Sequence, residues 1–209
     1  MPPQGATQGV NAMHPASEPQ PKKSRFWASV RDWAKAVTIA LVIVLPIRYF
    51  IAEPFVVNGA SMDPTFATGQ FLIVDRLTYD FSKPQRGDVI VFEYPNDPST
   101  YYIKRIIGLP GETISMKDGV PTIVASGTPA ITLDQWYIEA KHVSHDTIAP
   151  IHLGQTEYFV MGDNRAQSSD SRVWGPLDAR FIIGRPIVRL TPPSLFGILP
   201  GKYHETQTK

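Results

Sequence analysis

The chain of 209 residues contains no cysteine. This absence excludes disulfide bonds, thiolate metal ligands and a cysteine nucleophile. A strong net charge is also absent, because 20 basic and 19 acidic residues leave a formal charge of +1 at pH 7. The composition therefore gives no indication of a nucleic-acid partner. Two of the five histidines, His14 and His204, lie near the chain ends, so no Ser-His-Asp triad is evident.

Long apolar runs are scarce as well. Residues 36–47 carry no charge, and up to residue 52 the only charged residue is Arg48. The uncharged part is shorter than the ~20 residues of a typical membrane span, but aromatic residues flank it as expected at membrane interfaces. The first 35 residues hold five basic and two acidic side chains, which predicts a cytoplasmic N-terminus. We predict a single transmembrane helix at residues 25–52 behind a disordered cytoplasmic tail at residues 1–24, with a buried or amphipathic helix as the alternative.

After residue 52 the sequence changes to short β-type runs that are separated by turns with Gly and Pro. Residues 70–75, 88–93 and 158–161 are examples. Many short strands with such turns predict a mostly β fold, an antiparallel β-barrel or sandwich, over residues 53–191. Within it, residues 118–157 are less regular and indicate an insertion or cap. Residues 192–209 are predicted to form a C-terminal tail.

A lysine within an apolar strand pattern is the most informative single residue. Lys104 lies in residues 101–108, which are otherwise typical of a buried strand. In an apolar pocket, desolvation would lower the lysine pKa from ~10.4 and supply a neutral amine as a base. Ser61 lies on a turn with small neighbours, and a serine hydroxyl needs such a base to become a nucleophile. The alternative is a surface lysine and a serine that caps its own loop.

The segment 162–172 is unusually polar after a strongly apolar strand. It offers two acid–base pairings, Asp163 with Arg165 and Asp170 with Arg172, and three serines. A solvated loop with weak surface ion pairs is one interpretation. The other is a buried polar floor, in which these pairs hold one loop geometry and a serine orients the lysine amine.

Four segments, taken in order, resemble the motifs of bacterial type I signal peptidases, also called leader peptidases. The resemblance covers roughly residues 53–186, apart from the insertion. A lone Gly-x-Ser-Met would be a weak signal, whereas four ordered motifs behind an N-terminal anchor are a strong one. The motifs are GASMDPT at 59–65, KPQRGDVIVF at 83–92, YIKRIIGLPGE at 102–112, and GDNRAQSSDSR at 162–172, the last followed by Trp174-Gly175-Pro176.

This resemblance implies a role for each matching residue. Ser61 would be the nucleophile, Lys104 the general base and Ser168 the serine that orients the lysine. Asp163, Arg165, Asp170 and Arg172 match the supporting polar network. The residues that would line small apolar substrate pockets are Phe55, Val57, Met62, Leu72, Tyr102 and Ile103.

The sequence departs from one version of the family pattern at Gly59. Some members have a serine at this position, whose hydroxyl helps to bind the oxyanion. Backbone N–H groups, such as that of Ser61, would have to take this role here.

The implied activity is that of a membrane-bound serine endopeptidase that removes signal peptides from secreted precursors and cuts after small residues. It would lie in the bacterial inner (plasma) membrane, with its catalytic domain on the periplasmic or extracellular side. Its partners would be signal-peptide-bearing precursors and the lipid bilayer, close to the secretion translocon, with no nucleic acid. No cofactor and no metal are implied.

Three alternatives are weaker. A self-cleaving Ser/Lys protease of the repressor type would need a DNA-binding domain, which the N-terminal sequence does not resemble. A membrane-anchored β-module that binds peptides without cutting them would not need Ser61, Lys104 and Ser168 together. A metal site at His142, His145 and His152 has permissive spacing but no acidic partner.

Overall fold

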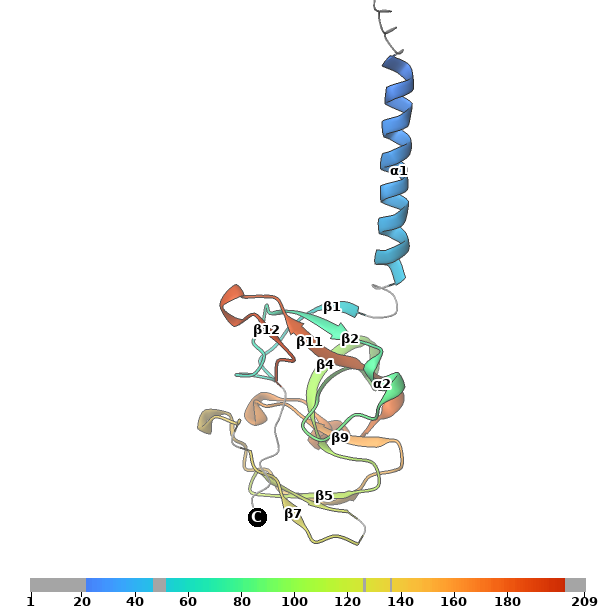
Figure 1. Ribbon diagram of the computed structural model, residues 1–209. Helices are drawn as coiled ribbons and strands as arrows, with labels where there is room; N and C mark the ends of the chain where they lie inside the picture. Colours follow the sequence, from blue (N-terminus) through green and yellow to red (C-terminus); the bar gives the residue numbers. More distant parts are fainter. Residues whose placement is uncertain (1–21, 47–51, 126, 136, 202–209) are drawn as a thin grey trace, which may run out of the picture. The chain divides into compact units, whose positions relative to one another are not determined.

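The computed structural model describes residues 22–46, 52–125, 127–135 and 137–201 (Figure 1). Nearly all of the predicted tail at residues 1–24, residues 47–51 of the predicted anchor and residues 202–209 lie outside this description. The chain divides into two compact units, residues 1–44 and 45–209, which we describe separately.

The first unit contains the helix α1, Lys22–Pro46, of 25 residues. Every side chain described from Ser29 to Leu45 is exposed, and the exposed set includes the large apolar side chains of Trp33, Val42 and Ile43. Among the described residues, no helix combines the length and the apolar character that crossing a membrane demands.

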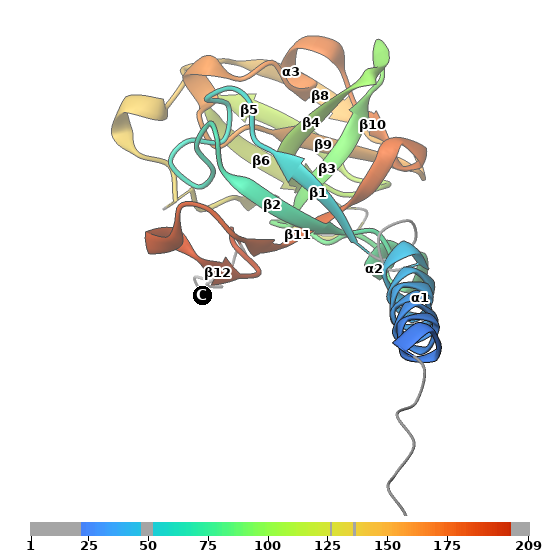
Figure 2. The ribbon, with the colours of Figure 1, turned by 90° about the horizontal axis from the view of Figure 1, so that it is seen from above.

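The second unit is built from two antiparallel sheets (Figures 1 and 2), which confirms the mostly β prediction. Within the described ranges the strands form no closed barrel. The larger sheet has the order β1-β2-β11-β3-β4-β9-β10, with β12 also paired to β11, and the smaller has the order β7-β6-β5-β8. The strands are β1 (Ala52–Val56), β2 (Phe71–Asp75), β3 (Val89–Tyr94), β4 (Asp97–Gly108), β5 (Thr113–Lys117), β6 (Val120–Val124), β7 (Ile131–Thr132), β8 (Ile148–His152), β9 (Glu157–Met161), β10 (Leu177–Asp178), β11 (Ile182–Arg189) and β12 (Gly197–Ile198).

Short helical turns connect these strands. The α-helical turns are α2 (Thr78–Phe81) and α3 (Ser171–Trp174). The 3₁₀ turns are η2 (Ala140–His142), η3 (Arg165–Gln167), η4 (Ala179–Phe181) and η5 (Pro193–Leu195).

Strand β9 and the end of β4 are buried on both faces, which explains the apolar runs at residues 106–107 and 158–161. Successive side chains of a strand point to opposite faces. Ile106 and Val160 accordingly pack into one apolar cluster, whereas their neighbours Ile107 and Phe159 pack into another. The second cluster also contains Ile114 and Ile123 of the smaller sheet. The second half of β4, in which Lys104 is the first buried residue, is therefore fixed between two cores.

Residues 118–157, predicted as an insertion or cap, supply β6, β7 and β8 of the smaller sheet. Figure 1 shows β5 and β7 at the end of the domain opposite β1 and β2, with β4 and β9 between them. Between β7 and β8 the described residues contain the short turn η2 and no strand.

Residues 192–201, predicted as part of a C-terminal tail, instead belong to the folded domain. They form η5 and β12, and Pro200 is buried. Arg105 Nη1 donates a 2.7 Å hydrogen bond to the carbonyl of Gly201, and Leu199 N–H donates one of 2.7 Å to Ile187. The segment covers the side chains of Phe66 and Thr65. A Cβ added to Gly201 would lie 2.9 Å from Phe66 and 3.0 Å from Thr65. The segment thus closes the core beneath the loop that carries Ser61.

Candidate active site

Ser61 lies on the loop that connects β1 to β2. Backbone hydrogen bonds of 2.9 Å from Val57 N–H to Gln70 and from Gly69 N–H to Val57 close this loop at its base. Met62, directly after the serine, is fully buried in an apolar cluster with Phe66. The serine is therefore held by a buried neighbour, while its own side chain remains partly exposed.

Lys104 approaches this serine from strand β4. Its Nζ lies 2.7 Å from Ser61 Oγ and 3.1 Å from the carbonyl oxygen of Ile103. The residue is only 3% exposed, and Nζ lies 5.1 Å from the centroid of the Tyr102 ring. The structure thus brings together the two residues that the sequence singled out first.

The surroundings of Lys104 favour its neutral form. Burial is the main cause that lowers the pKa of Lys104, to about 8, while the charges of Asp170 and Asp163 act in the opposite direction and that of Arg172 lowers it further. A lysine with this pKa supplies a useful fraction of free amine at mildly alkaline pH, which an exposed lysine does not.

Asp163 pairs with Arg105, and the predicted pairing with Arg165 is wrong. Arg105 Nε and Nη2 donate hydrogen bonds of 2.8 and 2.6 Å to the two oxygens of the Asp163 carboxylate, and both side chains are buried. Thr65 Oγ1 donates a third, of 2.6 Å. Arg105 follows Lys104 and points to the other face of β4. Through Asp163 and Thr65 it joins β4 to the loop at residues 57–70, which we name the nucleophile loop after its candidate nucleophile, Ser61.

Arg165 is buried among neutral acceptors instead. Its Nε donates a 3.0 Å hydrogen bond to the carbonyl of Gly162, its Nη1 donates to Gln135, and its Nη2 donates a 3.2 Å bond to the Tyr137 hydroxyl. Gln135 and Tyr137 belong to the segment between β7 and β8. This arginine therefore ties residues 162–172, which we name the catalytic segment, to the smaller sheet.

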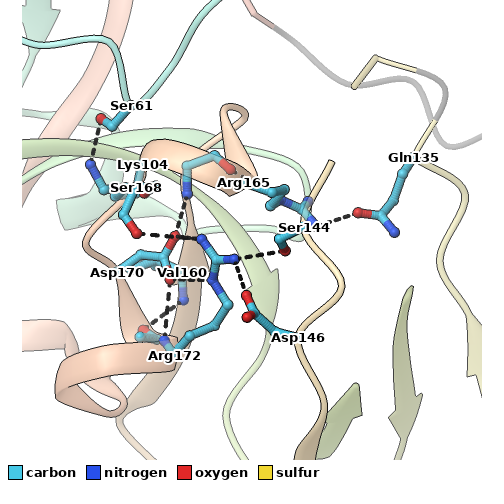
Figure 3. A network of polar contacts seen from close by, with 12 residues as sticks. Ser61, Lys104, Gln135, Ser144, Asp146, Val160, Arg165, Ser168, Asp170 and Arg172 are labelled. Carbon is cyan, nitrogen blue, oxygen red and sulfur yellow. Dashed lines mark hydrogen bonds and ion pairs between the residues drawn. The ribbon is translucent and has the colours of Figure 1, made fainter. Parts of the chain in front are cut away.

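The predicted pairing of Asp170 with Arg172 is confirmed (Figure 3). Arg172 Nε and Nη2 each lie 2.8 Å from an oxygen of the fully buried Asp170 carboxylate. Burial acts to raise the pKa of Asp170, but the hydrogen bonds and charge of Arg172, together with the Gly162 N–H and Ser168, hold this pKa below its usual range. Asp170 is therefore a permanent negative charge close to Lys104.

Ser168 lies beside this pair, yet it does not hydrogen-bond to Lys104. Its Oγ is buried and has no hydrogen bond of ordinary geometry within the described part of the chain, although it lies close enough to the Asp170 carboxylate to help lower that pKa. A Cβ built on Gly162 would lie 2.3 Å from both Ser168 Oγ and the carbonyl oxygen of Ser61. Glycine at 162 thus permits the catalytic segment to lie directly against the backbone of the nucleophile loop.

Gly59 has a backbone φ of +97°. Glycine adopts this left-handed region freely, whereas a side chain there is strained. The local backbone conformation therefore favours glycine at position 59.

A pocket of about 260 Å³ adjoins Ser61 and Lys104. Five of the six predicted pocket residues line it, namely Phe55, Val57, Leu72, Tyr102 and Ile103. Met62 does not, because its side chain is fully buried in the core below. Gln167 and Ser169 form a polar part of the pocket wall. The sequence did not predict this role, and the one sequence feature that could have indicated it is their position on either side of Ser168.

The three histidines considered for a metal site have separate surroundings. His145 Nδ1 lies 2.7 Å from Asp118, and His152 Nδ1 lies 3.2 Å from Thr113 Oγ1. His142 Nδ1 is buried and lies 4.0 Å from Glu139. Across the residues that the structure covers, no group of three or more acidic or histidine side chains has the arrangement of a metal site.

Comparisons with known proteins identify the family of this chain. The family model described as signal peptidase, peptidase S26, matches residues 30–191. A probable signal peptidase I-1 of Synechocystis sp. is 34% identical over 180 residues, which cover 83% of this chain and 88% of that protein. A signal peptidase I of Leptolyngbya laminosa is 34% identical over 193 residues, covering 88% and 91%. A signal peptidase I P of Bacillus subtilis subsp. natto is 39% identical over 148 residues, covering 69% and 79%. The chain therefore belongs to the S26 family of signal peptidases.

Proposed function

We propose that this chain is a membrane-bound serine endopeptidase that removes N-terminal signal peptides from secreted precursor proteins. The observation that carries the proposal is the 2.7 Å distance between Lys104 Nζ and Ser61 Oγ at the edge of an apolar pocket. Membership of the signal peptidase family supports the substrate class. Together they favour a hydrolase over a module that only binds peptides.

In this proposal Ser61 attacks the carbonyl carbon of the scissile bond while the neutral amine of Lys104 takes the hydroxyl proton. The resulting ammonium donates that proton to the leaving amine, which releases the mature protein and leaves an acyl group on Ser61. Lys104 then activates a water molecule that hydrolyses the ester. The lowered pKa of Lys104, about 8, suits a group that must both accept and donate a proton.

Supporting roles follow from the surroundings. We assign the oxyanion to backbone N–H groups at Ser61, since Gly59 has no side chain to donate. The Ser168 hydroxyl is buried without an ordinary partner, so it is available to the amine of Lys104 when the proton moves. Asp163, Arg165, Asp170 and Arg172 fix the segment around the dyad and do not touch the reacting atoms.

The substrate would bind as an added strand. Strand β1 is an edge of the larger sheet, and β9 pairs with β4 only from Arg105 onward. An extended precursor segment can therefore pair with backbone between β1 and the first half of β4. Phe55, Val57, Leu72, Tyr102 and Ile103 would receive the substrate side chains before the cut and restrict them to small residues.

Residues 25–52 would anchor the enzyme in the bacterial inner membrane, with a cytoplasmic N-terminus and the β-domain on the outer side. The support is the charge distribution of the sequence and the exposed apolar side chains of α1 between Val37 and Leu45. An anchor beside the lipid bilayer and the secretion translocon would raise the effective concentration of the enzyme for emerging precursors. Protease added to spheroplasts from outside should then digest the β-domain and spare the N-terminal residues; protection of the β-domain would rule out this orientation.

The activity itself is tested by incubating the purified full chain with a secretory precursor and identifying the product termini by mass spectrometry. We expect one cut after a small-x-small sequence, and none with Ser61→Ala. A precursor with Phe directly before the cut should be cleaved far more slowly than one with Ala, because the larger ring would have to displace packed atoms. Binding of the precursor without cleavage would favour the non-catalytic module, and equal rates for Phe and Ala would refute the pocket assignment.

A further inference from the structure

Arg172 bridges two carboxylates that come from different parts of the chain (Figure 3). Its Nε and Nη2 hold the buried Asp170, which lies in the catalytic segment. Its Nη1 lies 2.7 Å from Asp146 Oδ2 and 3.0 Å from Ser144 Oγ. Ser144 and Asp146 belong to residues 143–147, which follow η2 and precede β8 and which we name the cap turn.

The cap turn is itself fixed. The N–H of Gly119, at the turn between β5 and β6, donates a 2.9 Å hydrogen bond to the carbonyl of Asp146. A second contact between the same parts of the fold runs through Arg165, which donates to Gln135 and Tyr137. Two arginines of the catalytic segment are thus held by the smaller sheet and its connections.

A continuous series of contacts leads from Asp146 to the nucleophile. Asp146 holds Arg172, and Arg172 holds Asp170. The Oδ2 of Asp170 accepts a 3.0 Å hydrogen bond from the N–H of Gly162. Gly162 lies against the carbonyl of Ser61, and the next residue but one, Asn164, donates a 3.0 Å hydrogen bond to that carbonyl.

We propose that Asp146 is a positioning residue for catalysis, which holds Arg172 against Asp170 and thereby fixes the catalytic segment around Ser61 and Lys104. The inference rests on the proposed protease function and assigns part of the smaller sheet a role in it. Asp146 touches no reacting atom, so its effect must pass through Arg172.

The direction in which the pKa of Lys104 changes can show whether Asp146 acts through Arg172. The charged groups that act on Lys104 are Asp170 and Asp163, which raise its pKa, and Arg172, which lowers it; Arg105 pairs with Asp163 on the other face of β4. If Arg172 loses its contact with Asp146, it is held less firmly against Asp170. The negative charge of Asp170 is then less well neutralised, and the pKa of Lys104 rises. Direct removal of a negative charge near Lys104 would instead lower that pKa.

The test compares Asp146→Ala with Glu139→Ala in the full chain, using cleavage of a precursor. The two carboxylates are similarly exposed, at 53% and 48%, and both lie between β7 and β8. Among the described residues, however, the carboxylate of Glu139 pairs with its neighbours Lys141 and His142 and not with the catalytic segment. For Asp146→Ala we expect kcat to fall about tenfold, less than the ~10²-fold that a 1 Å misplacement can cost. KM should be unchanged, and the acidic limb of the pH–rate profile should move to higher pH. Glu139→Ala should match the wild type, and Asp146→Glu should recover part of the rate.

A double variant shows whether the effect passes through Arg172. In an Arg172→Ala background, Asp146→Ala should cause no further loss of kcat. An unchanged kcat, an acidic limb that moves to lower pH, or a loss that matches a smaller folded fraction in a thermal melt would each overturn the inference. If the wild-type chain cleaves no precursor at all, the proposed function fails instead, so the two failures are distinguishable.

Discussion

The amine of Lys104 and the hydroxyl of Ser61 lie 2.7 Å apart, although 43 residues separate them in the sequence. Lys104 is on a strand that is buried between two cores, and Ser61 is on a loop that buried Met62 holds in place. Neither side chain therefore has to be ordered by the substrate, which lowers the entropic cost of reaching a reactive geometry.

The first prediction concerns stability and pH. Lys104 titrates at about 8 when folded, against 10.5 as its ordinary value. Between these pH values the unfolded chain binds more protons than the folded one, so the wild type should gain stability as pH rises through this range. Lys104→Met has a similar length and no such titration. Below pH 8 the wild type should carry the full penalty of the buried ammonium, up to ~3 kcal/mol.

The measurement is the free energy of unfolding by guanidinium chloride for both proteins at several pH values. The difference between the two should shrink as pH rises from 8 to 10.5. A constant difference over this range would contradict the lowered pKa.

The second prediction concerns rate and pH. A general base must be neutral in the free enzyme, so kcat/KM for a precursor should rise with pH, with a midpoint near the folded pKa of Lys104, about 8. The profile is measured with one precursor in buffers of constant ionic strength. A midpoint near 6, where a histidine would titrate, would assign the base elsewhere.

The third prediction concerns the buried pair of Arg105 and Asp163. Arg105→Leu leaves the fully buried Asp163 without its counter-charge and should cost ~3–5 kcal/mol in the free energy of unfolding. The double variant Arg105→Leu/Asp163→Leu should lose less free energy of unfolding than the sum of the losses of the two single variants. Arg76→Ala breaks an exposed pair with Glu53, with side chains 44% and 33% exposed, and should cost below ~1 kcal/mol. Equal losses for the buried and exposed pairs would contradict this account.

The fourth prediction concerns the close approach at Gly162. Gly162→Ala places a methyl group 2.3 Å from the Ser61 carbonyl oxygen, so the nucleophile loop or the catalytic segment must move and cleavage should fall by at least ~10²-fold. Gly197→Ala is the matched control, since its Cβ would meet nothing nearer than 3.8 Å. Both are compared by cleavage rate and thermal melting. Wild-type activity in Gly162→Ala would show that the two segments need not lie this close.

The sequence predicted the parts of the site that local pattern determines. Lys104 stood out because a cation interrupts an apolar strand, and Ser61 because small residues surround it in a motif that resembles those of a known family. The continuous apolar run at residues 158–161 likewise predicted a strand. These features depend only on neighbours along the chain.

Pairings across the fold were not predictable in the same way. Asp163 was assigned to Arg165 because they are close in sequence, but the strand geometry brings Arg105, 58 residues away, into bidentate contact. The family resemblance implies that Met62 lines the pocket, yet the loop turns its side chain into the core. Residues 192–201 seemed a tail because their packing against Phe66 and Arg105 depends on distant parts of the chain.

The most direct test of the Ser61–Lys104 dyad is the single-turnover rate of precursor cleavage by the wild type, Ser61→Ala, Lys104→Ala, Lys104→Arg and the double alanine variant. Both single alanine changes should abolish cleavage while the proteins remain folded, and the double variant should be no worse than either, because the two residues act as one unit. Lys104→Arg should also fail, since a guanidinium stays protonated. Substantial cleavage by Lys104→Ala or Lys104→Arg would contradict the role of Lys104 as the base.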